Sequence, residues 1–137
     1  LSRRLSSAFS CYALPGVAQN LDLETAKKAY ADNAYDRALM AFRIGAKSGM
    51  KEAQYWLGLL YDRGHRVGRD SKIALQWFKK SAEQGHAKAQ YNLGVMYLIG
   101  SGVDKSLSDA KHWFRLAYEN GIEDVEILWN KYELWNY

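Results

Sequence analysis

The sequence predicts an all-α protein, built as an α-solenoid of antiparallel helix pairs. Three observations support this class. The same residue types return at an interval of 36 residues, which indicates a stack of similar supersecondary units. Between the returning glycines, apolar residues follow the spacing of a helix. The only proline, Pro15, precedes the repeats, so the repeating region lacks the strongest helix breaker.

The repeating positions allow each helix to be placed. The clearest helix starts at Asp70 or Ser71, whose side-chain oxygens can accept hydrogen bonds from free amides. It ends before Gly85, since glycine adopts the left-handed conformation without strain. The positions that keep the interval include Ala38, Ala74 and Ala110, Phe42, Phe78 and Phe114, and Gly49, Gly85 and Gly121. The pattern predicts about seven helices, near residues 22–32, 35–48, 50–63, 71–84, 86–99, 107–120 and 123–136.

Two glycines fall inside predicted helices and require an explanation. Gly58 and Gly94 are one interval apart, and each costs about 1 kcal/mol relative to alanine within a helix. A neighbouring helix that lies against the backbone would justify them. We expect the small residues of the alternate helices, Ala38, Ala74 and Ala110, to be the partners of that close approach.

Composition and charge restrict the classes of function. The chain has 137 residues, of which 48% are hydrophobic, enough for a continuous core. Its net charge of +4 includes Arg3 and Arg4, so the repeats themselves are too weakly basic to indicate nucleic-acid binding. Cys11 is the only cysteine and can form neither an internal disulfide nor a zinc site by itself. No stretch approaches the roughly 20 apolar residues of an integral membrane segment.

Residues 1–18 have the composition of a targeting leader. They contain two arginines, several serines and no acidic residue. Small residues at Gly16 and Ala18 suit cleavage by a signal peptidase after Ala18, which predicts a periplasmic or secreted protein. A mitochondrial presequence and a flexible tail are the alternatives. The repeat domain then covers residues 19–137, with units at 22–49, 50–85 and 86–121 and a half-repeat at 122–137.

The repeats resemble the Sel1-like repeat family of the tetratricopeptide-like superfamily. The residues that carry the resemblance are Ala53, Leu57, Gly58, Tyr61, Gly64, Val67, Asp70, Ala74, Trp77, Ala82 and Gly85, followed by Ala89, Leu93, Gly94, Tyr97, Gly100, Gly102, Val103, Ala110, Trp113, Ala117 and Gly121. Arg66, Ser106 and Tyr118 depart from the family pattern. The resemblance implies a right-handed superhelix whose first helices of each pair line a concave surface, and a role as scaffold or adaptor.

Catalysis, metal binding and cofactor binding are not expected. His65, His86 and His112 share no spacing of four residues that would place two ligands on one helix face. The serines are not in the sequence context of a nucleophile. The loop from Asp62 to Asp70 carries three arginines and is expected either to be solvated or to contact an acidic partner.

A protein or peptide partner is expected on the concave surface instead. Tyrosines at 30, 55 and 91 would form an aromatic ladder there, or would pack on adjacent helices. Lysine and arginine side chains would orient an acidic stretch of the partner. The residues assigned to this surface are Lys27, Tyr30, Tyr55, Leu59, Arg63, Lys88, Tyr91, Val95 and Leu98.

The C-terminal half-repeat has only one neighbouring helix pair to bury its aromatic residues. We expect Trp129 to be the buried anchor and Trp135 to be the more exposed of the two. Ile127, Leu134 and Tyr137 would also be partly exposed. Such a surface would support self-association or, as an alternative function, docking of a structural subunit into a larger assembly, which would be mitochondrial if the leader is a presequence.

Overall fold

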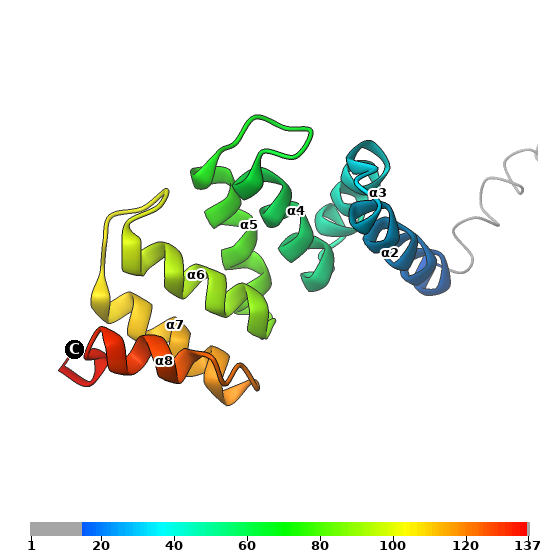
Figure 1. Cartoon of the computed structure of the whole chain (residues 1–137). Coiled ribbons are helices and arrows are strands. Elements are labelled where there is room, and N and C mark those ends of the chain that lie inside the picture. Colours follow the sequence, from blue (N-terminus) through cyan, green and yellow to red (C-terminus); the bar gives the residue numbers. More distant parts are fainter. Residues whose placement is uncertain (1–14, 137) are drawn as a thin grey trace, which may run out of the picture.

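The computed structural model describes residues 15–136 of the chain. Seven α-helices and one short 3₁₀ helix, η1, make up this part, which confirms the all-α prediction, and no strand occurs within it (Figure 1). The helices are α2 Pro15–Ala31, α3 Tyr35–Lys47, α4 Lys51–Arg63, α5 Ser71–Glu83, α6 Ala87–Ile99, α7 Leu107–Glu119 and α8 Val125–Lys131, followed by η1 Leu134–Asn136. Cys11 and Tyr137 lie outside the described residues.

Two elements differ from the sequence prediction. Helix α2 begins at Pro15 instead of residue 22, so the expected leader junction after Ala18 lies within its first turns. Proline fits the start of a helix because the amide it lacks would have no helical acceptor there. The predicted helix at 123–136 is shorter than expected, since α8 ends at Lys131 and Glu133 adopts a left-handed φ of 49°.

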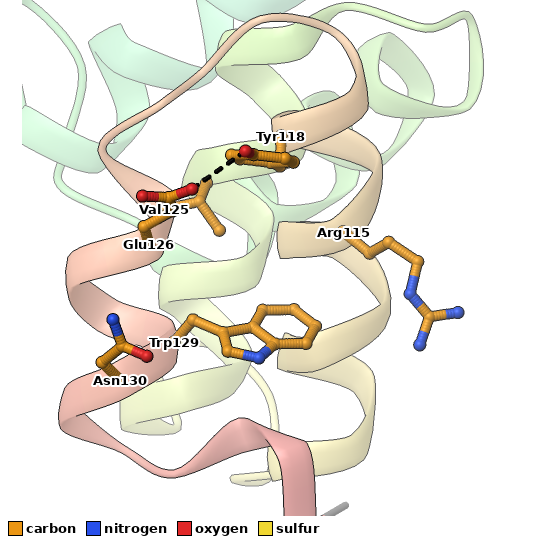
Figure 2. Close-up of a pocket in the computed structure, with 6 residues that line it drawn as sticks. All are labelled: Arg115, Tyr118, Val125, Glu126, Trp129 and Asn130. Carbon is orange, nitrogen blue, oxygen red and sulfur yellow. Dashed lines mark hydrogen bonds between the residues drawn. The ribbon is translucent and has the colours of Figure 1, made fainter.

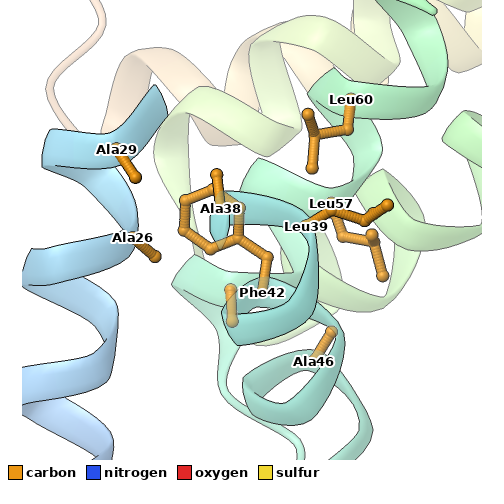
Figure 3. Packing of buried hydrophobic residues seen from close by; sticks show 9 residues of the cluster. Ala26, Ala29, Ala38, Leu39, Phe42, Ala46, Leu57 and Leu60 are labelled. Atoms are coloured by element: carbon orange, nitrogen blue, oxygen red, sulfur yellow. The ribbon is translucent and has the colours of Figure 1, made fainter. Parts of the chain in front are cut away.

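The helices pack in consecutive antiparallel pairs, and the chain forms a curved stack with α2–α3 at one end and α7–α8 at the other (Figure 1). Three hydrophobic clusters follow one another along the stack. The first joins α2, α3 and α4 around the fully buried Phe42 (Figure 3). Phe78 and Phe114 are equally buried in the second and third clusters, so the 36-residue interval marks one core position for each pair.

The helical glycines do face a close neighbour, but the expected neighbour was wrong. A Cβ atom at Gly58 would lie 2.8 Å from the ring of Phe78, and one at Gly94 would lie 2.6 Å from the ring of Phe114. The repeated phenylalanine, and not the repeated alanine, is therefore the group that excludes a side chain from these positions. Both rings are buried and cannot move aside without disturbing the core.

Helix ends follow the sequence signals. The Asp70 carboxylate accepts a hydrogen bond from the amide of Ile73 at 3.0 Å, which settles the choice between Asp70 and Ser71. Gly64 and Gly100 end α4 and α6 with φ values of 71° and 74°. Only glycine adopts this conformation without steric cost.

The arginine-rich loop between α4 and α5 rests on the first helix pair. The His65 ring stacks on Tyr35 with ring centroids 4.2 Å apart, and Val67 packs against the first cluster. Arg66 forms an ion pair with Asp36, at the start of α3. Part of the loop is therefore held by contacts within the chain and is not free for a partner. Arg69 remains exposed to solvent, as expected for a solvated loop.

Buried amides connect successive pairs in a way that the sequence prediction missed. Gln54 donates to the carbonyl of Ala46 and accepts a hydrogen bond of 2.8 Å from Gln84. One interval later, Gln90 donates to Ala82 and accepts from Asn120 at 2.9 Å. These bonds satisfy buried carbonyls between helices, and removal of one amide would leave its partners without a hydrogen bond.

Candidate functional site

The first helices of the pairs, α2, α4 and α6, are the ones that the sequence predicts to line a concave surface. Tyr30 of α2 contacts Trp56 of α4 edge to face, with ring centroids 5.1 Å apart. Trp56 contacts Tyr55 in the same geometry at 5.7 Å, and Tyr55 stacks on His86 at 4.7 Å. The aromatic row therefore runs from α2 to the start of α6. Tyr30 and Tyr55 each pack on the neighbouring helix and still remain half-buried.

A cavity of about 300 Å³ lies at the α4 and α6 end of this row. Its apolar walls come from three successive units. The lining residues are Glu52, Tyr55, Trp56, His86, Ala87, Lys88 and Ile122. Tyr55 and Lys88 belong to the surface assigned from the sequence, and the cavity is the place where these two meet.

Charged groups border the aromatic row. Lys27 forms ion pairs with Glu52 and, at 3.0 Å, with Glu24. Arg63 donates a hydrogen bond of 2.9 Å to the hydroxyl of Tyr30. Of the three cations assigned to a partner, Lys27 and Arg63 are thus engaged within the chain, whereas Lys88 is exposed at the rim of the cavity.

Burial shifts the pKa of two residues that line the cavity. It raises the pKa of the Tyr55 phenol, against the opposing effect of the Arg63 charge. It also lowers the pKa of His86, although the nearby Glu52 carboxylate acts in the other direction. The Nδ1 atom of His86 accepts a hydrogen bond from the amide of Ala89 and caps α6. Nε2 of the neutral ring then carries the proton and is the atom that can donate.

Four assigned residues contribute less surface than expected. Leu59 and Leu98 are only 6% and 4% exposed and belong to the second and third hydrophobic clusters, which corrects their assignment to a partner surface. Val95 and Tyr91 are half-buried against the third cluster, where Tyr91 contacts the ring of Phe114. All four belong to or pack against these clusters, which also contain residues of the second helix of the pair and of the following unit.

The sequence prediction missed most of the cavity wall. Trp56, His86 and Ile122 were not assigned to the binding surface. A signal for the last two was present, because Met50, His86 and Ile122 are spaced by the 36-residue interval. Met50 and His86 directly precede α4 and α6, and Ile122 lies three residues before the start of α8.

A second cavity, of about 490 Å³, lies between α7 and α8 (Figure 2). It is lined by Arg115, Tyr118, Val125, Glu126, Trp129 and Asn130. Tyr118 takes the position of the buried Ala46 and Ala82, and its hydroxyl donates a hydrogen bond of 2.9 Å to Glu126. The departure from the repeat pattern thus places a partly exposed phenol ring in the wall of this cavity.

The exposure of the C-terminal side chains agrees in part with the sequence prediction. Trp129 packs against the third cluster while Trp135 is 54% exposed, which confirms their expected order. Ile127 is exposed as expected, at 69%. Leu134 is fully buried, and its predicted exposure was wrong because the left-handed Glu133 turns η1 back onto α7.

The described residues form neither a metal-binding group nor a membrane-spanning helix. Among residues 15–136, no three histidine, cysteine, aspartate or glutamate side chains are grouped so that they could hold a metal ion. In the same part of the chain, every helix is too short or too polar to cross a membrane.

Comparisons with known proteins identify the repeats. The Sel1 repeat matches residues 51–86 and 87–122. The structure of a Sel1 repeat protein from Oxalobacter formigenes is 36% identical, with a TM-score of 0.73 over 77% of this chain and 42% of that one. The structure of c5321, a protective antigen present in uropathogenic Escherichia coli strains, is 26% identical, with a TM-score of 0.73 over 80% of this chain and 24% of that one.

A third structure supports the fold alone. Helicobacter pylori cysteine rich protein B is 19% identical, with a TM-score of 0.67 over 80% of this chain and 93% of its own. No curated protein matches the sequence. The chain spans less than half the length of the first two relatives.

Proposed function

Because the chain belongs to the Sel1 repeat family, whose scaffold is typical of protein-interaction modules, we propose that it binds a peptide or protein segment along its concave surface. The observation that carries this proposal is the cavity at Tyr55 and His86. Its aromatic walls would hold an apolar side chain of the partner, since such rings offer a large contact area at low entropic cost.

The groups at the rim define what the partner should carry beside that side chain. Lys88 is exposed there and would pair with a carboxylate of the partner. Nε2 of His86 would donate to a carbonyl or carboxylate oxygen. The favoured ligand is therefore an extended segment with a bulky apolar residue next to an acidic one.

The proposed location is the bacterial envelope, either periplasmic or secreted. The composition of residues 1–18 supports export, and so does the similarity to a protective antigen of uropathogenic Escherichia coli. A mitochondrial location remains the alternative. Detection of the tagged full-length chain in fractionated host cells would decide between these compartments.

Binding is tested with a displayed library of random peptides and the full chain. Tyr55→Ala should weaken the selected peptides at least about tenfold, because it removes one wall of the cavity. Lys79→Ala is the matched control, since Lys79 is exposed on α5 away from the cavity. Helical content, measured by circular dichroism, should be equal in both. Equal losses of binding in the two variants would contradict a binding site at the cavity.

A second candidate function is supported by the other end of the stack. Ile127 of α8 and Trp135 of η1 are exposed, at 69% and 54%. An exposed apolar surface of this kind is typical of a subunit that docks into an assembly. In this alternative the C-terminal segment, and not the concave surface, carries the contact.

A further inference from the structure

Helix α3 is apolar on its solvent side as well as on its core side. Met40 and Ile44 are 68% and 63% exposed, although they lie one helical turn apart on the face opposite the buried Phe42. In α5 the same two repeat positions are Gln76 and Lys80. The exposed pair is therefore particular to α3 and is not required by the repeat.

Three cations surround this pair. Arg37, Arg43 and Lys47 are exposed on α3, and none of them forms an ion pair with another residue between 15 and 136. We call Arg37, Met40, Arg43, Ile44 and Lys47 the α3 face. It is an apolar centre with a positive border, so its partner should have an apolar centre with a negative border.

The C-terminal segment of the same chain has these properties. Its exposed apolar side chains are Ile127, Tyr132 and Trp135. Acidic residues are their neighbours in sequence, and between 123 and 136 only Lys131 is basic. We call the exposed side chains of this segment, Glu123, Glu126, Ile127, Tyr132, Glu133 and Trp135, the tail face.

The two faces cannot meet within one molecule. Helix α3 lies at one end of the curved stack and α8 lies at the other (Figure 1). We propose that the tail face of one copy docks on the α3 face of a second copy, in a head-to-tail arrangement. This inference rests on the second candidate function and names its partner. Because different faces meet, the contact is heterologous, and each added copy leaves one face of each kind free.

Charge complementarity favours a second copy over the other occupants. Two α3 faces would bring six cations together, and two tail faces would bring their carboxylates together, so a symmetric contact through either face is opposed. An anionic membrane would also attract the α3 face, but it would leave the tail face uncovered. The head-to-tail contact covers both faces with one interaction.

The experiment uses sedimentation of the full chain over a range of concentrations and salt. The parent should form species larger than a monomer, with association weakened by salt because charge pairs are screened. Ile44→Asp in the α3 face and Ile127→Asp in the tail face should each weaken association at least about tenfold. Both residues are more than half exposed, so the variants should fold as the parent does. Gln76→Asp, at the repeat position of Met40, is the control and should associate like the parent.

A mixture of the two variants distinguishes the arrangement. Each variant keeps one intact face, so an equimolar mixture should form one-to-one dimers and no larger species. Association of Ile44→Asp at parental strength would overturn the inference while leaving docking through the tail face intact. A parent that stays monomeric at all concentrations would also overturn it. If that monomer bound anionic lipid vesicles, and only Ile44→Asp abolished the binding, the α3 face would be assigned to lipid instead.

Discussion

At the scale of single residues, the side chain that packs against a repeat position determines which residue types fit there. Gly58 and Gly94 are conspicuous because glycine disfavours helices, yet what requires them is the ring of the next phenylalanine. At the position of the buried Ala46 and Ala82, Tyr118 is instead 47% exposed and donates a hydrogen bond to Glu126.

Replacement of Gly94 by alanine tests the close contact with Phe114. Alanine favours the helix by about 1 kcal/mol, but its Cβ would lie 2.6 Å from a buried ring. We expect a net loss of about 1–3 kcal/mol in the free energy of unfolding, measured with urea. Gly68→Ala is the matched control, since a Cβ there meets nothing within 4 Å, and its stability should equal or exceed that of the parent. An unchanged Gly94→Ala would show that the ring can move aside.

His86 should make stability depend on pH. Burial lowers its pKa below the ordinary 6.5, so the folded chain binds this proton less readily than the unfolded chain does. Its contribution is fully present above pH 6.5 and is lost as the pH falls towards the folded-state pKa. The urea midpoint should therefore fall more between about pH 7.5 and about pH 5.5 in the parent than in His86→Asn, because asparagine caps a helix without titrating in this range. Identical pH profiles would contradict the burial of the neutral ring.

At the scale of elements, the last helix differs from the others. Helix α8 has seven residues against thirteen in each helix from α3 to α7, and η1 completes its packing. Val125, the first residue of α8, and Leu134, the first residue of η1, are both buried in the third cluster with Leu98 and residues of α7. The segment thus covers the last pair through a few apolar anchors, and its other side chains remain exposed.

Two neighbouring residues of η1 allow this division to be tested. Leu134→Ala removes a fully buried side chain and should lower the free energy of unfolding by about 2–4 kcal/mol. Trp135→Ala removes a larger side chain that is 54% exposed, and it should cost less than about 1 kcal/mol. Chemical denaturation of both variants gives the comparison. A larger loss from Trp135→Ala would mean that the indole, and not Leu134, anchors the tail.

At the scale of the whole molecule, the chain is a one-dimensional stack. The helices that pack extensively against each other are neighbours in sequence. The one addition is η1, which packs on α7 as well as on α8. Stability in such an arrangement is the sum of local units and the interfaces between them. The middle helices have neighbours on both sides, whereas α2 and α8 have a helix pair on one side only.

Hydrogen exchange should reflect this architecture. We expect amides in α4 to α7 to be better protected than those in α2 and α8, because end units open without breaking two interfaces. Leu134→Ala should increase exchange in α7 and α8 more than in α2 and α3. The measurement is exchange resolved by peptide and read by mass spectrometry. Equal protection from α2 to α8, with equal acceleration in the variant, would indicate one cooperative unit instead.

The periodicity of the sequence was sufficient to determine the fold class, the helix count, most helix bounds and the family. Helical spacing, caps such as Asp70 and terminating glycines act over a few residues, so they can be read from the chain directly. The order of exposure of Trp129 and Trp135 was also predicted correctly.

Only the tertiary structure decided which side chains remain accessible. Leu59 and Leu98 occupy predicted surface positions but are covered by the next unit, and Trp56 and His86 line a cavity that periodicity did not reveal. A period identifies the face of a helix, whereas burial depends on the distance and angle of helices far apart in sequence. Those quantities are set by side chains such as Phe114 and Tyr118 in three dimensions, and they place the cavities and the exposed faces of this protein.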